Sequence, residues 1–152
     1  MQCLNSILLA EDDPSGAELT ISALSELNLA NRVDVVDDGE QVLEYLQRVG
    51  RFQDRPSGNP ILILMDLKMP KMTGLDALRW LRGQEKFRSI PVVILTSSRE
   101  ESDLVEAYGL GVNAYVVKPV DFVEFIRTVK QLGVFWALVN EPPPECVNGT
   151  DR

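Results

Sequence analysis

The run Ile61–Met65, five apolar residues preceded by Pro60, constrains the fold of this chain more than any other feature. An uninterrupted apolar run of this length predicts a strand that is buried on both faces, as in a parallel sheet covered by helices on either side. Pro70 and Gly74 follow and end the strand. Asp66 stands directly after the run. A carboxylate at that position indicates either a functional group or the cap of the next turn.

Four further apolar runs predict strands over residues 7–10, 33–36, 91–96 and 114–117. Amphipathic segments predict helices over about 14–28, from 39, over about 74–84, over about 98–108 and from 122. Each of these helices begins at a residue with capping chemistry: Asp13, Asp38, Thr73, Ser98 or Asp121. Strands that alternate with helices predict one domain with the flavodoxin-like architecture (βα)5, a three-layer α/β sandwich with a parallel sheet.

The apolar spacing predicts which helix faces are buried. In the first helix Ala17, Ile21 and Leu24 are expected in the core, and in the second helix Val49 closes a stripe that begins at Val42. The last helix is expected to be long, with a stripe that runs to Trp136. Residues 50–60 form a long loop, whose basic residues Arg51 and Arg55 are expected to be a solvated surface rather than a phosphate site.

Composition excludes several classes of function. The chain has no histidine, so it contains no Ser-His-Asp triad, no histidine-ligated zinc and no phosphohistidine carrier. A net charge of −8 without a long basic run argues against nucleic-acid binding. No apolar run is long enough to cross a membrane and no signal peptide is evident, so we expect a cytoplasmic protein with no membrane partner.

The residues that end the predicted strands carry complementary chemistry. Ligands of parallel sheets bind beyond the carboxyl ends of the strands. The side chains expected there are Glu11, Asp12, Asp66, Thr96 and Lys118. Like charges ~4 Å apart repel by roughly 4 kcal/mol at an effective dielectric constant of ~20, so three carboxylates need a cation, and oxygen ligands favour Mg²⁺. With a lysine and a hydroxyl, this set predicts transfer of a phosphoryl group onto an aspartate.

The chain resembles the receiver domain of two-component response regulators from Ser6 to Val139. The motifs that carry the resemblance are Glu11-Asp12, Leu64–Gly74, Leu95–Ser98 and Tyr115–Pro119. The resemblance implies a sheet of order 2-1-3-4-5 and a phosphorelay switch rather than an enzyme, apart from self-phosphorylation and self-dephosphorylation that depend on Mg²⁺.

The resemblance also assigns roles to residues. Asp66 is expected to be the phosphoacceptor, with Mg²⁺ bound by Asp12, Asp66 and the backbone carbonyl of Lys68, and Glu11 holding a metal-bound water. Lys118 is expected to contact the phosphoryl oxygens, next to a cis peptide at residue 119.

Thr96 and Tyr115 would form the switch pair that remodels the surface of the fourth helix, the fifth strand and the fifth helix. In the acidic run 11–13, the register favours Asp13 as the cap of the first helix rather than a site residue.

We expect a receiver domain over 1–139, a disordered tail over 140–152 and no output domain, so the signal must reach a partner protein or change self-association. Beside its core stripe, the last helix carries the apolar residues Val123, Val134, Phe135 and Leu138. The expected dimer contacts are Val134, Phe135, Trp136 and Leu138. A helix that is apolar on two faces usually buries both, which predicts a homodimer. The alternative is an apolar end folded under the tail.

The long loop and the Phe135-Trp136 pair resemble the receiver-only regulators that are paired with bacterial and cyanobacterial phytochromes, which suggests a red-light histidine kinase as phosphodonor. The downstream target is unknown. Two other families share this chemistry or this sheet: haloacid-dehalogenase-like phosphatases and flavodoxin-like cofactor carriers. The first expects Asp-x-Asp after its first strand, and the second a phosphate loop where residues 11–13 are acidic. A degenerate receiver that acts as a docking module is a further alternative.

Overall fold

A computed structural model of the chain describes residues 6–25, 32–56, 58–96, 108–118 and 121–133. The strands are β1 (Ser6–Ala10), β2 (Arg32–Val36), β3 (Leu62–Asp66), β4 (Val92–Thr96) and β5 (Ala114–Val117). The helices are α1 (Pro14–Ser25), α2 (Gly39–Gln47), α3 (Gly74–Arg82) and α5 (Phe122–Leu132), with a short 3₁₀ helix, η1 (Gly50–Phe52). None of the helices among these residues is long and apolar enough to cross a membrane.

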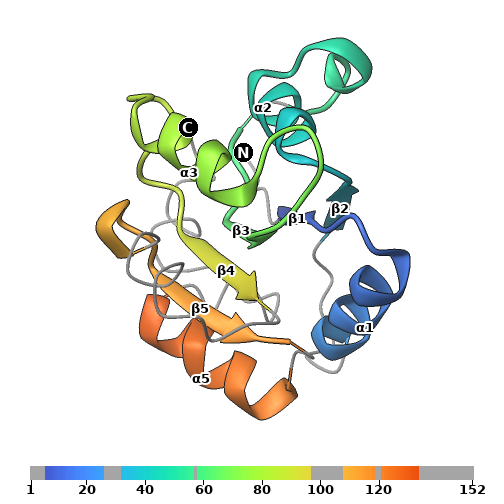
Figure 1. Cartoon of the computed structure of the whole chain (residues 1–152), viewed down its shortest axis with the longest axis vertical. Helices are drawn as coiled ribbons and strands as arrows, with labels where there is room; N and C mark the ends of the chain where they lie inside the picture. The colour runs from blue at the N-terminus through green and yellow to red at the C-terminus, as the bar shows by residue number, and fades with distance from the viewer. Residues whose placement is uncertain (1–5, 26–31, 57, 97–107, 119–120, 134–152) are drawn as a thin grey trace, which may run out of the picture.

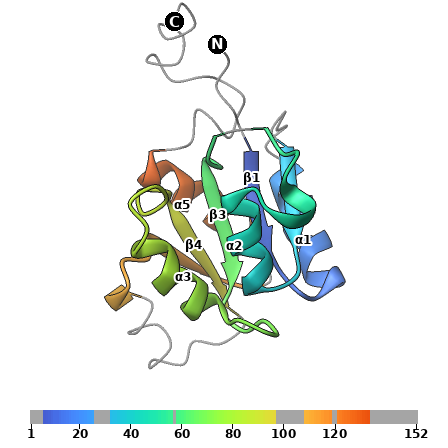
Figure 2. The ribbon, with the colours of Figure 1, turned by 90° about the horizontal axis from the view of Figure 1, so that it is seen from above.

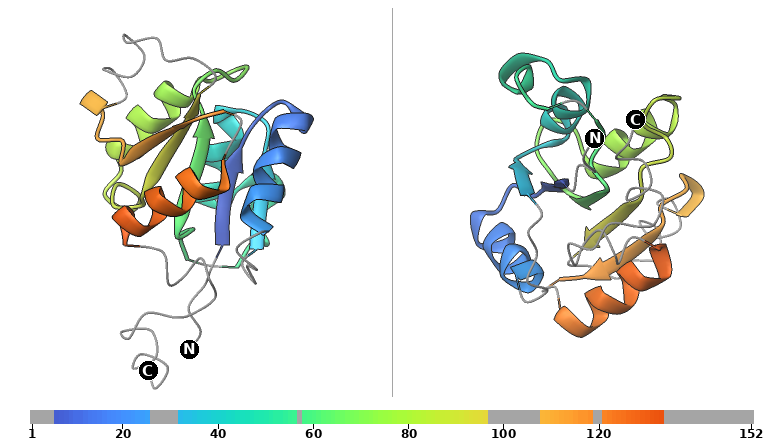
Figure 3. Two further views of the ribbon diagram at one scale, coloured as in Figure 1. Left: turned by 90° about the horizontal axis from the view of Figure 1, so that it is seen from below. Right: turned by 180° about the vertical axis from the view of Figure 1, so that it is seen from behind.

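The five strands form one sheet of order β2-β1-β3-β4-β5, as predicted, and every neighbouring pair is parallel (Figure 1). Helices α2 and α3 cover one face, and α1 and α5 cover the other (Figures 2 and 3). The core is therefore divided in two by the sheet. Ile63 and Met65 of β3 pack into the layer under α2 and α3, whereas Leu62 and Leu64 pack into the layer under α1 and α5.

Four predicted helix starts lie in the described residues, and each has a capping hydrogen bond. The side chains of Asp13, Asp38, Thr73 and Asp121 accept from backbone N–H groups in the first turns of α1, α2, α3 and α5. The helices therefore begin within one residue of the predicted positions, because local hydrogen bonding alone determines these ends.

Two predicted core positions are wrong. Ile21 is 37% exposed, and Thr20 is buried in its place, with its hydroxyl donating to the carbonyl of Gly16 inside the helix. Val49 is 45% exposed because α2 ends at Gln47, where Arg48 takes a left-handed conformation (φ 58°). Tyr45, which the apolar stripe did not include, is fully buried on this helix.

The expectation that the basic residues of the 50–60 loop are solvated is wrong for Arg55. Its side chain is 8% exposed and lies 4.1 Å from the centre of the Tyr45 ring. Its Nε donates to the carbonyl of Tyr45 and its Nη1 to the carbonyl of Gly58, both at 3.0 Å. Arg55 therefore fastens the loop to the end of α2.

Helix α5 ends at Leu132, where Gly133 takes a left-handed conformation (φ 77°). The prediction of a continuous helix that reaches Trp136 is therefore wrong. Val134, Phe135, Trp136, Leu138 and the 140–152 tail lie outside the described residues, as do residue 119 and most of the helix predicted over 98–108. Just after that segment, Gly111 has φ 78° and donates its N–H to the carbonyl of Tyr108 at 3.0 Å.

Candidate functional site

The five candidate side chains stand at the carboxyl ends of four adjacent strands. Glu11 and Asp12 follow β1, Asp66 ends β3, Thr96 ends β4, and Lys118 follows β5. Because these strands are neighbours in the sheet and all run in the same direction, their ends meet at one edge. The fold thus brings together residues that are more than one hundred positions apart in the chain.

Lys118 joins the carboxylates of this edge. Its Nζ lies 2.7 Å from Oε1 of Glu11 and 3.0 Å from Oδ2 of Asp66. The Glu11 side chain has no exposed surface, and the Asp66 side chain is also buried. Two carboxylates therefore share one ammonium group, and the cluster retains a negative charge.

The pKa shifts reflect this imbalance. Burial raises the pKa of Glu11, and the neighbouring carboxylate of Asp66 raises it further. Together these two effects outweigh the hydrogen bond from Lys118, which lowers the pKa. Burial by itself lowers the pKa of Lys118, but the hydrogen bonds to Glu11 and Asp66 raise it above its ordinary value. Lys118 is therefore a fixed positive charge at neutral pH.

Asp12 completes an all-oxygen cluster that fits a divalent cation. One carboxylate oxygen from each of Glu11, Asp12 and Asp66 lies within 4.8 Å of the others. Asp12 is exposed, so water has access to the cluster. Hard cations such as Mg²⁺ prefer a few carboxylate ligands and retain several waters. The backbone N–H of Lys68 lies 3.4 Å from Oδ1 of Asp66. That the backbone carbonyl of Lys68 binds the metal stays a prediction.

The loop after Asp66 is held by close backbone contacts. The N–H of Gly74 donates to the carbonyl of Leu67 at 2.8 Å, and a Cβ atom on Gly74 would overlap the carbonyl oxygen of Asp66. On the other side, the N–H of Gly39 donates to the carbonyl of Met72 at 3.0 Å. Only glycine fits at these approaches, and they fix the position of Asp66 relative to α2 and α3.

Thr96 ends β4 at this edge, and Tyr115 lies on the neighbouring strand β5, three residues before Lys118. Thr96 is buried, and its carbonyl accepts the backbone N–H of Lys118 at 2.7 Å. Tyr115 is half-buried on β5 and packs against the core layer under α2 and α3. Its ring meets the ring of Tyr108 edge-on, 5.8 Å away. Tyr108 was not singled out from the sequence, because this contact depends on the tertiary fold.

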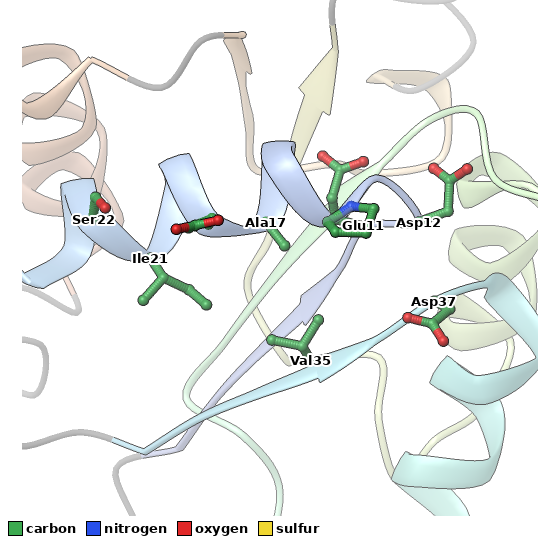
Figure 4. Close-up of a pocket in the computed structure, with 9 residues that line it drawn as sticks. Glu11, Asp12, Ala17, Ile21, Ser22, Val35 and Asp37 are labelled. Atoms are coloured by element: carbon green, nitrogen blue, oxygen red, sulfur yellow. The ribbon is translucent and has the colours of Figure 1, made fainter.

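A pocket of about 390 Å³ adjoins the acidic cluster between α1 and β2. Figure 4 shows Glu11 and Asp12 at one end of it and the apolar side chains of Ile21 and Val35 along its length. The exposed Ile21 thus lines this pocket. Asp13 is not part of the acidic cluster, because its carboxylate accepts the N–H of Ser15 at 3.1 Å and caps α1.

Comparison with known proteins identifies the family. A model of the response regulator receiver domain matches residues 7–130. The chain is 35% identical over 137 residues to the probable methanogenesis regulatory protein FilR2 of Methanothrix harundinacea, covering 90% of this chain and 86% of that protein. It is 32% identical over 130 residues to response regulator Rcp1 of Synechocystis sp., covering 86% and 87%.

Solved structures agree with this assignment. The bacteriophytochrome response regulator RtBRR superposes with a TM-score of 0.82 at 54% identity, covering 99% of this chain and 90% of that one. The Mn²⁺-bound form of Rcp1 superposes with a TM-score of 0.72 at 31% identity, covering 88% and 94%. With a family match over most of its length and an acidic cluster suited to a divalent metal, this chain belongs to the receiver domains of response regulators in two-component signalling.

Proposed function

We propose that the protein is a phosphorelay switch in which Asp66 accepts a phosphoryl group from the phosphohistidine of a partner kinase. The contact of one lysine with both Glu11 and Asp66, at 2.7 and 3.0 Å, carries this proposal. It supports Asp66 as the acceptor because this carboxylate contacts a fixed ammonium group and also belongs to the acidic cluster that suits a cation. Receiver domains in general are signalling switches rather than enzymes, which agrees with this role.

In the transfer step a carboxylate oxygen of Asp66 attacks phosphorus, the P–N bond of the phosphohistidine breaks, and the imidazole leaves with the bonding electron pair. Lys118 lies where its ammonium group can stabilise the charge on the phosphoryl oxygens. A divalent cation, when held by Glu11, Asp12 and Asp66, supplies charge neutralisation. Attack of water on the acyl phosphate would later return free Asp66. This reversal resets the switch without turnover of an outside substrate.

The readout that we propose involves Thr96 and Tyr115. A phosphorylated Asp66 gains about −1.5 to −2 charges and three acceptor oxygens. The Thr96 hydroxyl turns toward those oxygens, and the Tyr115 ring moves into the space behind it. This movement would separate Tyr115 from Tyr108 and change the surface predicted for the fourth helix, β5 and α5.

The test is the intact mass of the protein after incubation with acetyl phosphate, with and without Mg²⁺. Wild type should gain one phosphoryl group only when Mg²⁺ is present, and Asp66→Asn should gain none. Asp37→Asn is the matched control, because Asp37 is an exposed aspartate that also follows a strand, and it should label like wild type. A wild-type protein that stays unlabelled while a known receiver is labelled would leave only a docking role.

We further propose a phytochrome kinase as the phosphodonor, because RtBRR, with 54% identity, is a bacteriophytochrome response regulator. Phosphotransfer from a purified bacteriophytochrome should be faster by at least tenfold than transfer from an unrelated histidine kinase. This comparison is needed because the chain is also similar to FilR2, a probable regulator of a different process. Equal transfer rates from both kinases would contradict the phytochrome assignment.

For the assembly we propose a homodimer through Val134, Phe135, Trp136 and Leu138, within a unit of residues 1–139 followed by the 140–152 tail. Light scattering should give the mass of two chains for wild type and of one chain for Phe135→Ser/Trp136→Ser. A control with Val123→Ser, an exposed apolar residue of α5, should remain dimeric. A monomeric wild type, with or without phosphorylation, would contradict this proposal.

A further inference from the structure

A small pocket with a cationic lining lies at the opposite end of the sheet from Asp66. It occupies about 240 Å³ and is formed by the end of α2, the loop before β3 and the turn before β4. The residues that line it are Leu46, Arg48, Arg55, Gly58, Asn59 and Lys86. Three of these carry positive charge and none is acidic. In a chain with a net charge of −8, such a concentration of cations is not a consequence of overall composition.

Arg55 is the buried member of this lining. Its Nε and Nη1 donate to backbone carbonyls, but its Nη2 is buried without a hydrogen-bond partner. Buried donors are almost always paired. The guanidinium group that lines this pocket therefore carries positive charge that its backbone partners leave partly unmatched. Burial lowers the pKa of Arg55, the Tyr45 phenol partly offsets this, and the nearby charge of Arg48 lowers it further.

The other two cations stand on segments that hydrogen bonds to the backbone bring to the pocket. Arg48 takes a left-handed conformation at the end of α2, and its Nε donates to the carbonyl of Arg55 at 3.0 Å. The amide of Asn59 donates to the carbonyl of Lys86 at 3.0 Å, which joins the loop to the turn before β4. Each of these segments thus contributes one positive side chain to the same small space.

We propose that this pocket, lined by Arg48, Arg55 and Lys86, binds a single phosphate group, either free or as a monoester. A phosphate presents several acceptor oxygens to three cationic side chains, one of which is the guanidinium group of Arg55. The pocket is smaller than the roughly 300–1,000 Å³ of sites for drug-sized ligands, so it accommodates the phosphate group rather than a nucleotide. Bound phosphate would join α2, the 50–60 loop and the turn before β4.

The test is an ¹H–¹⁵N NMR titration of the full chain with sodium phosphate, in EDTA and at constant ionic strength. EDTA keeps the acidic cluster free of metal, so that its carboxylates repel the anion. Phosphate should cause saturable shifts at the amides of Arg48, Gly58, Asn59 and Lys86 and at the Nε–H of Arg55. The double variant Arg48→Gln/Lys86→Gln should weaken binding at least tenfold.

The matched control is Lys71→Gln/Arg127→Gln, which removes two positive charges from exposed sites that do not line the pocket. It should change the affinity less than twofold. Glycerol phosphate in place of inorganic phosphate distinguishes a monoester from the free ion, and tight binding of either supports the site. Shifts that do not saturate, that sodium chloride reproduces, that acetate produces equally well, or that persist in Arg48→Gln/Lys86→Gln would overturn the proposal.

Discussion

At the carboxyl end of the sheet two buried carboxylates share one ammonium group, whereas at the amino end a buried guanidinium is paired with backbone carbonyls. Glu11 and Asp66 receive Lys118 from the far end of the chain, 107 and 52 residues away. Arg55 finds its carbonyls within ten residues, at Tyr45, Pro56 and Gly58. The first cluster exists only in the complete fold, and the second depends mainly on one local segment.

The comparison shows how the same sheet holds charge of both signs. At the carboxyl end the carboxylates outnumber the lysine, and the surplus negative charge suits a cation. At the amino end the cations have neutral partners, and the surplus positive charge suits an anion. The acidic end is open to solvent through Asp12, but Arg55 is almost completely buried. Removing the charge of Asp12 should therefore affect ligand binding, whereas removing the charge of Arg55 should affect folding.

The largest effect on folding is expected from Arg55→Ala. This change removes two 3.0 Å hydrogen bonds from a charged donor and the contact with the Tyr45 ring. Each such hydrogen bond contributes ~1.5–3 kcal/mol, partly offset by release of the buried charge, so the free energy of unfolding should fall by about 3 kcal/mol. Urea denaturation measures this change.

Arg51→Ala is the matched control. Arg51 also lies over an aromatic ring, that of Phe52, at 4.7 Å, and donates to Gln41, but it is exposed. Its loss should change the free energy of unfolding by less than about 1 kcal/mol. Equal effects of the two variants would show that burial does not distinguish these arginines.

At the acidic end, Mg²⁺ should stabilise the wild-type protein by about 2.7 kcal/mol at one hundred times its dissociation constant. Asp12→Asn should abolish this gain while changing the metal-free stability by less than about 0.5 kcal/mol, because Asp12 is exposed. Asp13→Asn should keep the full gain, since asparagine also caps a helix. Thermal unfolding with and without Mg²⁺ measures both variants. A full Mg²⁺ response in Asp12→Asn would remove Asp12 from the metal site.

Tyr45 gives the amino end a measurable pH dependence. Burial and the 2.7 Å hydrogen bond to Asp34 raise the pKa of Tyr45 to about 12 from 10.0. Because the folded state favours the neutral phenol, this contribution to stability is complete below pH 10 and is lost as the pH rises from 10 through 12.

Tyr45→Phe should lower the free energy of unfolding by about 1–2 kcal/mol near pH 8, where the hydrogen bond to the carboxylate is intact. The difference from wild type should shrink steadily above pH 10. Urea denaturation of both proteins over this pH range measures the difference. A constant gap up to about pH 11.5 would contradict the raised pKa of Tyr45.

The sequence predicted the strands, the helix starts and the grouping of Glu11, Asp12, Asp66 and Lys118. Continuous apolar runs define buried parallel strands, and parallel strands place their carboxyl ends together, so few assumptions were needed. One error lies where a polar residue satisfies its own hydrogen bonds in the core. Thr20 does so through the carbonyl of Gly16 inside α1, and it displaces Ile21 from the core.

Arg55 was mispredicted for a related reason. An arginine in a loop is normally solvated, and nothing in the order of residues 50–60 shows that carbonyls of Tyr45 and Gly58 converge on it. The left-handed turn at Arg48, a position where glycine is usual, also carries no local sequence signal. Neither the buried arginine nor the cationic pocket follows from a pattern of apolar and polar residues, because both depend on backbone groups.

The smallest expected effect tests whether all acids at the carboxyl end belong to the metal cluster. Asp38 follows β2 and is buried, but its Oδ1 accepts the N–H of Gln41 at 2.9 Å as the cap of α2. Asp38→Ala should therefore cost about 1 kcal/mol of stability, and Asp38→Asn, which keeps a capping oxygen, less than about 0.5 kcal/mol. Both variants should keep the full Mg²⁺ stabilisation in thermal unfolding. If Asp38→Asn loses the Mg²⁺ response while Asp12→Asn keeps it, the cation binds on the β2 side of the edge, away from Lys118.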